Sequence, residues 1–192
     1  ANEIHLPVDR PVDLALRSTD VIHSFWVPRL AGKLDMIPGQ TNHLRFTPTE
    51  VGRFRGECAE FCGLQHAHMA FVVVVEPAAD FEQWLADHDG EPEPPAAGSA
   101  AARGREVFAG ASCAGCHTIE GVSSGQAGPD LTMLADRSTL AAGTLPNDPE
   151  ALRAWIRDPD ASKPGAEMPP TPPSLLSDDQ LDDLVAYLGE LR

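Results

Sequence analysis

The chain has 192 residues, of which 42% are hydrophobic and 22% charged, a composition typical of a folded protein and not of a disordered one. Its formal net charge of −15 argues against nucleic-acid binding, which depends on an excess of Lys and Arg to neutralise phosphates. The longest apolar run, residues 69–75, is too short for a bilayer, which takes roughly 20 apolar residues. No signal peptide is visible, and we expect a soluble portion whose membrane segment, if there is one, lies upstream.

The first part of the chain predicts β-structure. Residues 12–18 alternate apolar and polar side chains, as a half-buried strand does, and residues 42–48 and 52–58 follow with Pro and Gly between them. Residues 69–77 form a β-branched run that ends at a proline. Short strands separated by turns predict an all-β Greek-key sandwich or barrel.

A short amphipathic helix over residues 78–88 closes this first domain, with Phe81, Trp84 and Leu85 on one face. Residues 89–101 then change in composition to Pro, Gly, Ala, Ser and acidic residues, which is typical of a linker partly stiffened by proline. We therefore place the domains at residues 1–88 and 102–192, joined by the linker 89–101.

The second domain predicts an all-α fold. Helices are expected over residues 102–110, over 148–159 with Asp148 as cap and Pro149 at the first helical position, and over 177–192 with Ser177 as cap. Residues 103–192 carry 7 basic and 14 acidic side chains, so a partner that is attracted by charge would be basic where it docks.

Cys113, Cys116 and His117 form a Cys-x-x-Cys-His motif, which is typical of covalent haem c attachment. Two thiols one helical turn apart can each bond a haem vinyl group, and the adjacent histidine then reaches the iron. Met168, in a loop stiffened by prolines, is the candidate sixth ligand, and His/Met ligation suits electron transfer. Met133 is the competing ligand, although its surroundings favour core packing. A redox dithiol or half of a zinc site is the alternative, but a βαβ context and two further zinc ligands are missing.

The helical pattern of this domain resembles the class I cytochromes c. The matching residues lie before the cysteine pair, in a Gly-Pro motif after it, and in the last two helices and the loop between them. They are Gly104, Phe108, residues 128–131, Trp155, residues 168–170 and Tyr187. The resemblance implies that Gly104 lets the terminal helices cross closely. It also implies that a carbonyl beside the Gly-Pro proline fixes the proximal histidine.

Residues 56–71 gather side chains that an apolar core does not need. Cys58, Cys62, His66 and Met69 follow at spacings of four, four and three. A blue-copper site uses one cysteine and two histidines, so a mononuclear site would leave one thiolate over. Two thiolates can instead bridge two copper ions, each with one histidine and one weak ligand, and His23 is the candidate for the second histidine.

Two other interpretations of this cluster remain open. A Cys58–Cys62 disulfide would prevent the pair from bridging copper. A zinc ion could take Cys58, Cys62, His66 and either His23 or His68. Outside such a site we expect His68 to face solvent. We also expect His5, His43 and His88, which lack partner motifs, to be surface residues.

Residues 23–28 and 58–69 together resemble the dinuclear copper A site of cytochrome c oxidase subunit II, and the resemblance extends over nearly all of residues 4–78. It implies a cupredoxin-like barrel in which copper is bound by the side chains of His23, Cys58, Cys62, His66 and Met69 and by the backbone carbonyl of Glu60. In the assembled oxidase the Glu60 carboxylate would also face a magnesium ion at the boundary with subunit I.

The two motifs together resemble subunit II of bacterial oxidases that carry their own cytochrome c domain. That resemblance implies an electron-transfer subunit of a terminal respiratory oxidase. An external donor, such as a cytochrome c, another small redox protein or a quinol-oxidising complex, would reduce haem c. Haem c would then pass the electrons to copper A, and copper A would pass them to subunit I, where oxygen is reduced. It also implies a periplasmic location, other oxidase subunits as partners, and two transmembrane helices that would precede the chain seen here.

Three alternatives come from other classes. They are a free di-domain electron carrier, the electron-entry domain of another copper A reductase such as one for nitrous oxide, and a structural zinc-and-haem protein.

Overall fold

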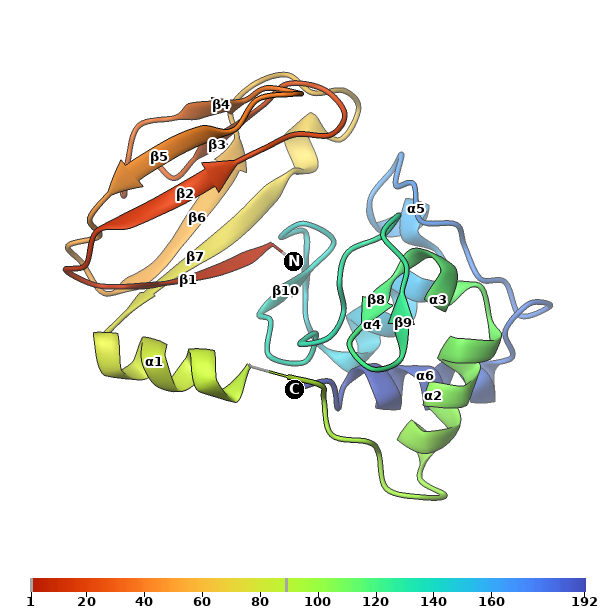
Figure 1. Ribbon diagram of the computed structural model, residues 1–192. Coiled ribbons are helices and arrows are strands. Elements are labelled where there is room, and N and C mark those ends of the chain that lie inside the picture. Colours follow the sequence, from red (N-terminus) through yellow and green to blue (C-terminus); the bar gives the residue numbers. More distant parts are fainter. Residues whose placement is uncertain (1, 89) are drawn as a thin grey trace. The chain divides into compact units, whose positions relative to one another are not determined.

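The computed structural model describes residues 2–88 and 90–192 and divides into two compact units (Figure 1). One unit comprises residues 2–87 with 142–144, and the other comprises residues 88–141 and 145–192 apart from the undescribed position 89. Within the described residues, no helix is both long and apolar enough to span a membrane.

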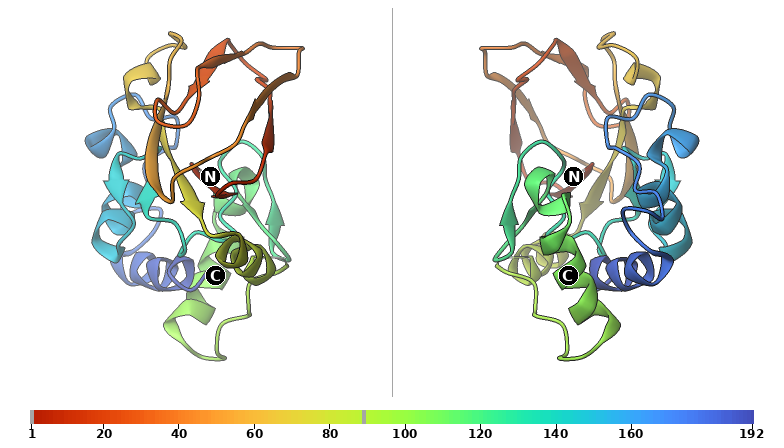
Figure 2. Two further views of the ribbon diagram at one scale, coloured as in Figure 1. Left: turned by 90° about the vertical axis from the view of Figure 1, so that its left-hand side faces the viewer. Right: turned by 90° about the vertical axis from the view of Figure 1, so that its right-hand side faces the viewer.

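The first unit is built from two sheets. The larger sheet has the strand order β1-β7-β6-β3-β4, in which only β1 and β7 pair in parallel, and the smaller sheet pairs β2 with β5. The strands are β1 (Glu3–Pro7), β2 (Val12–Leu16), β3 (His23–Trp26), β4 (Leu34–Met36), β5 (Asn42–Phe46), β6 (Gly52–Cys58) and β7 (Ala70–Glu76). Figure 2 shows these red-to-yellow strands as the walls of an open barrel.

The barrel core follows from the alternation along the strands. In β6, Phe54 and Gly56 are buried while Arg53 and Arg55, on either side of Phe54, face outward. The buried side chains that meet between the two sheets are Leu6, Leu16, Phe25, Val27, Phe54, Val73 and Val75. The predicted all-β domain is thus confirmed. Strands β2, β5 and β6 lie where strands were predicted, and β7 lies where the β-branched run predicted one. Strands β3 and β4, of four and three residues, are too short to show a period of their own.

Helix α1 (Ala78–Asp87) follows β7 directly, as predicted. Trp84 stacks on the ring of His5 with centroids 4.1 Å apart, and Phe81 packs on Trp84 with centroids 6.1 Å apart. Leu85, which the pattern placed on the same face, is instead 53% exposed. The helix is therefore held on β1 by aromatic stacking and not by a continuous apolar stripe.

Two histidines that the sequence placed on the surface have partners. The side chain of His5 is 12% exposed and its Nδ1 lies 2.8 Å from a carboxylate oxygen of Glu76. The side chain of His88 is 15% exposed and its Nε2 lies 3.2 Å from Asp136. The surface prediction was wrong for both, because a lone histidine in sequence does not reveal an acid that the fold brings from far along the chain.

The second unit is mainly helical, as predicted. Its helices are α2 (Ala100–Gly110), α3 (Cys113–Cys116), α4 (Pro149–Arg157), α5 (Pro159–Ser162) and α6 (Asp178–Leu188). Asp148 caps α4, and Ser177 caps α6 in a capping box with Gln180. Two short antiparallel ladders also occur, β8 (Thr118–Ile119) with β9 (Ser123–Ser124) and β10 (Thr139–Leu140) with β11 (Leu145–Pro146).

Helices α2 and α6 cross at Gly104, where a Cβ atom would lie 2.0 Å from the carbonyl oxygen of Asp183. Only glycine permits this approach, as the resemblance to class I cytochromes implied. Phe108 packs edge-on against Tyr187 beside the crossing, with centroids 6.2 Å apart. Arg103 closes the crossing on its outer side through two contacts to the Asp183 carboxylate, at 2.6 and 2.8 Å.

Candidate metal and haem sites

The first candidate site lies at one end of the barrel, where β6 ends and β3 begins. Phe25 of β3 pairs with Cys58 of β6, which brings the start of β3 beside the loop that follows β6. The amide of Cys58 donates to the carbonyl of Met69 at 3.0 Å, and the amide of Ala59 donates to the carbonyl of Ser24 at 2.9 Å. Both ends of the loop 59–69 are therefore fixed to the sheet.

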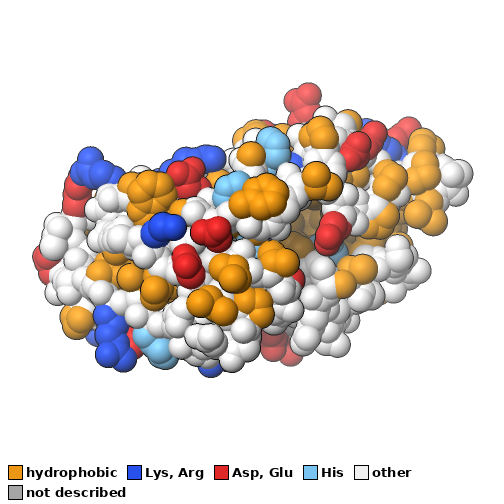
Figure 3. Space-filling model, turned by 90° about the horizontal axis from the view of Figure 1, so that it is seen from above, with side chains coloured by type: hydrophobic (Ala, Val, Ile, Leu, Met, Phe, Trp, Pro, Cys, Tyr) orange, Lys and Arg blue, Asp and Glu red, His pale blue; other side chains and the backbone are white. Residues whose placement is uncertain are grey.

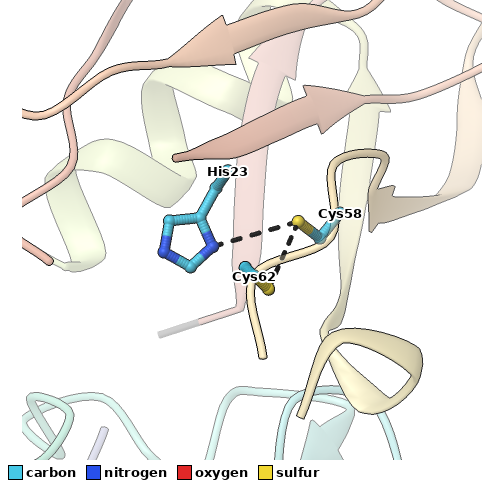
Figure 4. Close-up of side chains that lie close together, drawn as sticks. All are labelled: His23, Cys58 and Cys62. Carbon is cyan, nitrogen blue, oxygen red and sulfur yellow. Dashed lines mark hydrogen bonds between the residues drawn. The ribbon is translucent and has the colours of Figure 1, made fainter. Parts of the chain in front are cut away.

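The two thiols lie at the centre of the site, with one histidine beside each. Cys58 Sγ is 3.8 Å from Cys62 Sγ and 3.9 Å from His23 Nδ1 (Figure 4). Cys62 Sγ is 3.7 Å from His66 Nδ1. The structure thus brings together four side chains that are contributed by β3, by the end of β6 and by the loop.

Two weaker donors complete the group. The backbone oxygen of Glu60 is 3.1 Å from Cys58 Sγ, and Met69 Sδ is 4.0 Å from Cys62 Sγ. All six residues predicted for copper therefore have a donor atom within 4.0 Å of one of the two sulfurs.

The surroundings treat the two thiols differently. Burial is the largest influence on Cys58 and raises its pKa, but hydrogen bonds with the backbone of Ser24 and Glu60 and with the imidazoles of His66 and His23 lower it to about 7. Burial and the neighbouring Cys58 thiolate raise the pKa of Cys62 to about 11. A thiolate at Cys58 opposes a second negative charge at Cys62, and a bound cation would relieve that repulsion.

The donor set fits two copper ions better than the alternatives. A zinc ion would use the two sulfurs and the two imidazoles and would leave the Glu60 carbonyl and Met69 without a role. Both cysteines are free thiols, so the described form holds no disulfide at this point. His68 is exposed, as expected for a residue that takes no part in the cluster.

Apolar side chains surround the cluster on the outside. Phe61 is 76% exposed and Leu64 is 92% exposed within the loop, and Val21 and Ile22 are 46% and 44% exposed just before β3. Figure 3 shows hydrophobic side chains gathered beside histidines on one face. The ring of Phe61 also contacts the ring of His66, with centroids 5.7 Å apart.

Asp20 is a neighbour of the cluster that the sequence analysis did not single out. Its Oδ1 lies 3.0 Å from Nε2 of His23. The hydrogen bonds from His23 and Ser18 lower the pKa of Asp20 to about 2. A carboxylate three residues before a candidate ligand is the sequence signal that could have found it.

The second candidate site is centred on His117, directly after α3. Its Nδ1 lies 2.8 Å from the carbonyl oxygen of Pro129, so the ring donates a hydrogen bond from Nδ1–H. Nε2 is then unprotonated, and its lone pair can bind a metal. The ring also packs on Gly128, where a Cβ atom would lie 2.5 Å from Cε1. This orientation of the ring fits a histidine that binds iron through Nε2.

Two of the other residues predicted for haem, Cys113 and Met168, pack against the core of the helical unit. Cys113 is half-buried, and burial raises the pKa of its thiol, while Cys116 is exposed on the same helical turn. Met168 is half-buried and packs against the core of the helical unit. Its loop is fixed by the Gly165 amide, which donates to Asp160 Oδ1 at 2.7 Å.

Comparison with known proteins assigns each half of the chain separately. Residues 1–76 match the sequence model of the family described as "Cytochrome C oxidase subunit II, periplasmic domain", and residues 101–192 match that of cytochrome c.

The chain is 40% identical over 190 residues to cytochrome c oxidase subunit 2 of Alkalihalophilus pseudofirmus, covering 99% of this chain and 54% of the relative. It is 34% identical to that of Bacillus subtilis over 100% of this chain and 56% of the relative. The chain thus spans about half the length of these relatives.

Among solved structures, the periplasmic domain of subunit II of cytochrome oxidase of Bradyrhizobium japonicum is 34% identical, with a TM-score of 0.43. The comparison covers 45% of this chain and 63% of that one. By the two matched sequence models, the β unit of the chain belongs to the cytochrome c oxidase subunit II periplasmic-domain family, and its helical unit belongs to the cytochrome c family.

Proposed function

We propose that this chain is the extramembrane electron-transfer portion of subunit II of a haem-copper respiratory oxidase. In this role it would hold dinuclear copper A in its β unit and covalent haem c in its helical unit. The similarity of this chain, over its whole length, to about half of oxidase subunits 2 favours this function over a free electron carrier or another copper A reductase.

The observation that carries the proposal is the grouping of six donor atoms, two of which are the sulfurs of Cys58 and Cys62. His23, Cys58, Glu60, Cys62, His66 and Met69 would hold the copper pair. When bound, the pair would supply exchange of single electrons, with the charge spread over both ions. The residues contribute a rigid frame, because both ends of the loop are hydrogen-bonded to strands, and a rigid frame limits rearrangement when the charge changes.

The helical unit would supply the second centre. Cys113 and Cys116 would form the thioethers, and His117, through Nε2, and Met168 would bind the iron. The hydrogen bond from His117 to the carbonyl of Pro129 would fix the ring and raise its basicity. His/Met ligation supports electron transfer and not oxygen chemistry.

The remaining parts of the proposal concern the assembly. Subunit I and other oxidase subunits would be the partners on the periplasmic side, and an external donor would deliver electrons to haem c. Membrane anchoring would lie outside the chain described here. The Glu60 carboxylate would face a magnesium ion at the boundary with subunit I, and residues 89–101 would link domains 1–88 and 102–192.

The direct test is metal analysis together with electron paramagnetic resonance of the full chain. After haem attachment, the thiols of Cys58 and Cys62 are reduced and the chain is then loaded with copper. We expect two copper ions and one haem per chain. The copper signal should show a seven-line hyperfine pattern, because one unpaired electron is shared by two equivalent nuclei.

Three results would contradict this assignment: a four-line pattern, a single bound metal ion, or zinc in place of copper. The chain could also bind both copper and haem but show no reduction of copper after rapid reduction of the haem. The two sites would then remain assigned, and the proposed order of electron transfer from haem to copper would be wrong.

A further inference from the structure

The two histidines of the copper cluster are held in different ways. His66 contacts the ring of Phe61, whereas His23 has a polar partner on the ring nitrogen that does not face the sulfurs. In Figure 4 one nitrogen of His23 points toward Cys58 and the other points away from both thiols. The nitrogen that points away is Nε2, which lies 3.0 Å from Asp20 Oδ1.

The contact with Asp20 determines which nitrogen of the neutral His23 ring carries the proton. An ionised carboxylate can only accept hydrogen bonds, so the proton of His23 must be on Nε2. Nδ1 is then the unprotonated nitrogen, and it is the one that lies 3.9 Å from Cys58 Sγ. The contact therefore fixes both the tautomer and the rotation of the ring in the form that a metal ion requires.

Asp20 is itself held, although its side chain is 67% exposed. The hydroxyl of Ser18 lies 2.8 Å from the same Oδ1 and 2.5 Å from the carbonyl oxygen of Val21. The amide of Asp20 in turn donates to the Ser18 hydroxyl at 3.4 Å. The segment 18–21 thus forms a turn closed by its own hydrogen bonds, which keeps the carboxylate in front of His23.

We propose that Asp20 is a positioning residue for the copper centre, which orients His23 so that Nδ1 is presented to the metal. This inference rests on the proposed copper function. Asp20 touches no metal in this role and acts only through the imidazole, with Ser18 holding the carboxylate in place.

The test compares Asp20→Ala and Asp20→Asn with the wild-type full chain, using copper ions alone as the probe. Copper affinity is measured by chelator competition, and the His23 tautomer of the copper-free chain by ¹⁵N nuclear magnetic resonance. Asp20→Ala should lower copper affinity roughly 10–100-fold. It should also shift the ring from the Nε2–H form toward a mixture. Asp20→Asn keeps an acceptor oxygen without the charge, so it should retain the tautomer and most of the affinity.

Asp13→Asn is the matched control, because Asp13 accepts from His43 at 2.8 Å on the same unit and neither residue belongs to the copper cluster. It should leave the copper affinity and the His23 tautomer unchanged. Thermal unfolding of each copper-free variant checks that the fold is retained.

Two results would overturn the positioning role. In one, Asp20→Ala keeps both the wild-type affinity and the Nε2–H tautomer. In the other, Asp20→Asn loses as much affinity as Asp20→Ala, which would assign the effect to charge alone. Failure of the proposed function is distinguishable from both, because the wild-type chain itself would then bind fewer than two copper ions.

Discussion

The copper cluster and the haem motif are assembled in opposite ways. Three of the residues predicted for haem lie within five consecutive positions: Cys113 and Cys116 begin and end the short helix α3, and His117 is its C-cap. The residues proposed for copper are contributed by β3 at position 23, by the end of β6 at position 58 and by the loop that ends at position 69. One site is therefore largely a local motif, and the other depends on the pairing of β3 with β6.

This difference determines what each site needs from the rest of the fold. A thioether-linked haem remains attached to its cysteines even when the surrounding helices loosen, although the iron then loses its orientation. The copper donors are held only by the barrel and by hydrogen bonds at both ends of one loop. Local changes should therefore affect the copper site through its ligands, and the haem site through the packing that orients His117.

The largest effect is expected from Cys58→Ser. The Cys58 sulfur lies at the centre of the copper cluster, and a serine hydroxyl is not ionised near neutral pH and cannot bridge two copper ions. Copper content should fall from two ions to one or none, with loss of the seven-line pattern, as measured by metal analysis and paramagnetic resonance. The absorption spectrum of haem c should not change. Cys113→Ser is the reciprocal variant and should leave the copper pattern intact.

Gly104→Ala should be the most destabilising change in the helical unit. The added methyl group would lie 2.0 Å from the backbone oxygen of Asp183, so α2 and α6 must separate. We expect a loss of about 3 kcal/mol of unfolding free energy, the upper end for overpacked cores. Denaturant unfolding followed by haem absorption measures it.

Gly110→Ala is the matched control in the same helix, because a Cβ atom there meets no heavy atom within 4 Å. It should change the unfolding free energy by less than about 1 kcal/mol. Equal losses for the two variants would show that the close crossing of α2 and α6 does not limit stability.

Gly128→Ala should affect the haem site without unfolding the unit. Its methyl group would lie 2.5 Å from Cε1 of His117 and displace the ring from the carbonyl of Pro129. We expect an altered haem midpoint potential and a stability loss of about 1–2 kcal/mol. Gly115→Ala is the control, because Gly115 lies in the Cys-x-x-Cys-His motif and a Cβ atom there would meet open space. It should leave the haem midpoint potential unchanged.

The smallest effect concerns His5, which links β1 and β7 to α1. Burial is the largest single influence and lowers its pKa, but the hydrogen bonds and charges of Glu3 and Glu76 together raise it above the ordinary value of 6.5. The stabilisation by protonated His5 is complete below pH 6.5 and is lost as the pH rises through the folded-state pKa. His5→Gln should therefore cost about 1 kcal/mol in mildly acidic buffer and less in alkaline buffer.

Chemical unfolding of the first unit at several pH values, followed by tryptophan fluorescence, measures this difference. His43→Gln is the control, because the His43–Asp13 pair is about half exposed and such pairs contribute little. If the loss for His5→Gln were the same at every pH, stacking on Trp84 and not the charge of His5 would explain its role.

The sequence by itself determined the motifs and the class of each half. Period-two alternation predicted β2, β5 and β6, a β-branched run predicted β7, and capping residues predicted α4 and α6, because these signals act between residues close in the chain. The haem motif needed only five consecutive residues. The ligand spacing of the copper loop is likewise a local signal. The count of histidines pointed to His23, and the resemblance supplied the Glu60 carbonyl.

Only the tertiary structure decided which distant groups meet. The contact of His5 with Glu76 and the approach of Gly104 to Asp183 join residues more than seventy positions apart. Neither leaves a periodic signal, because the side chains that fit together are chosen by strand pairing and helix crossing. The same holds for His23 and Cys58, whose separation of 3.9 Å follows from the register of β3 on β6. The chain thus carries its chemistry in short motifs, and the geometry that makes the chemistry work comes from packing.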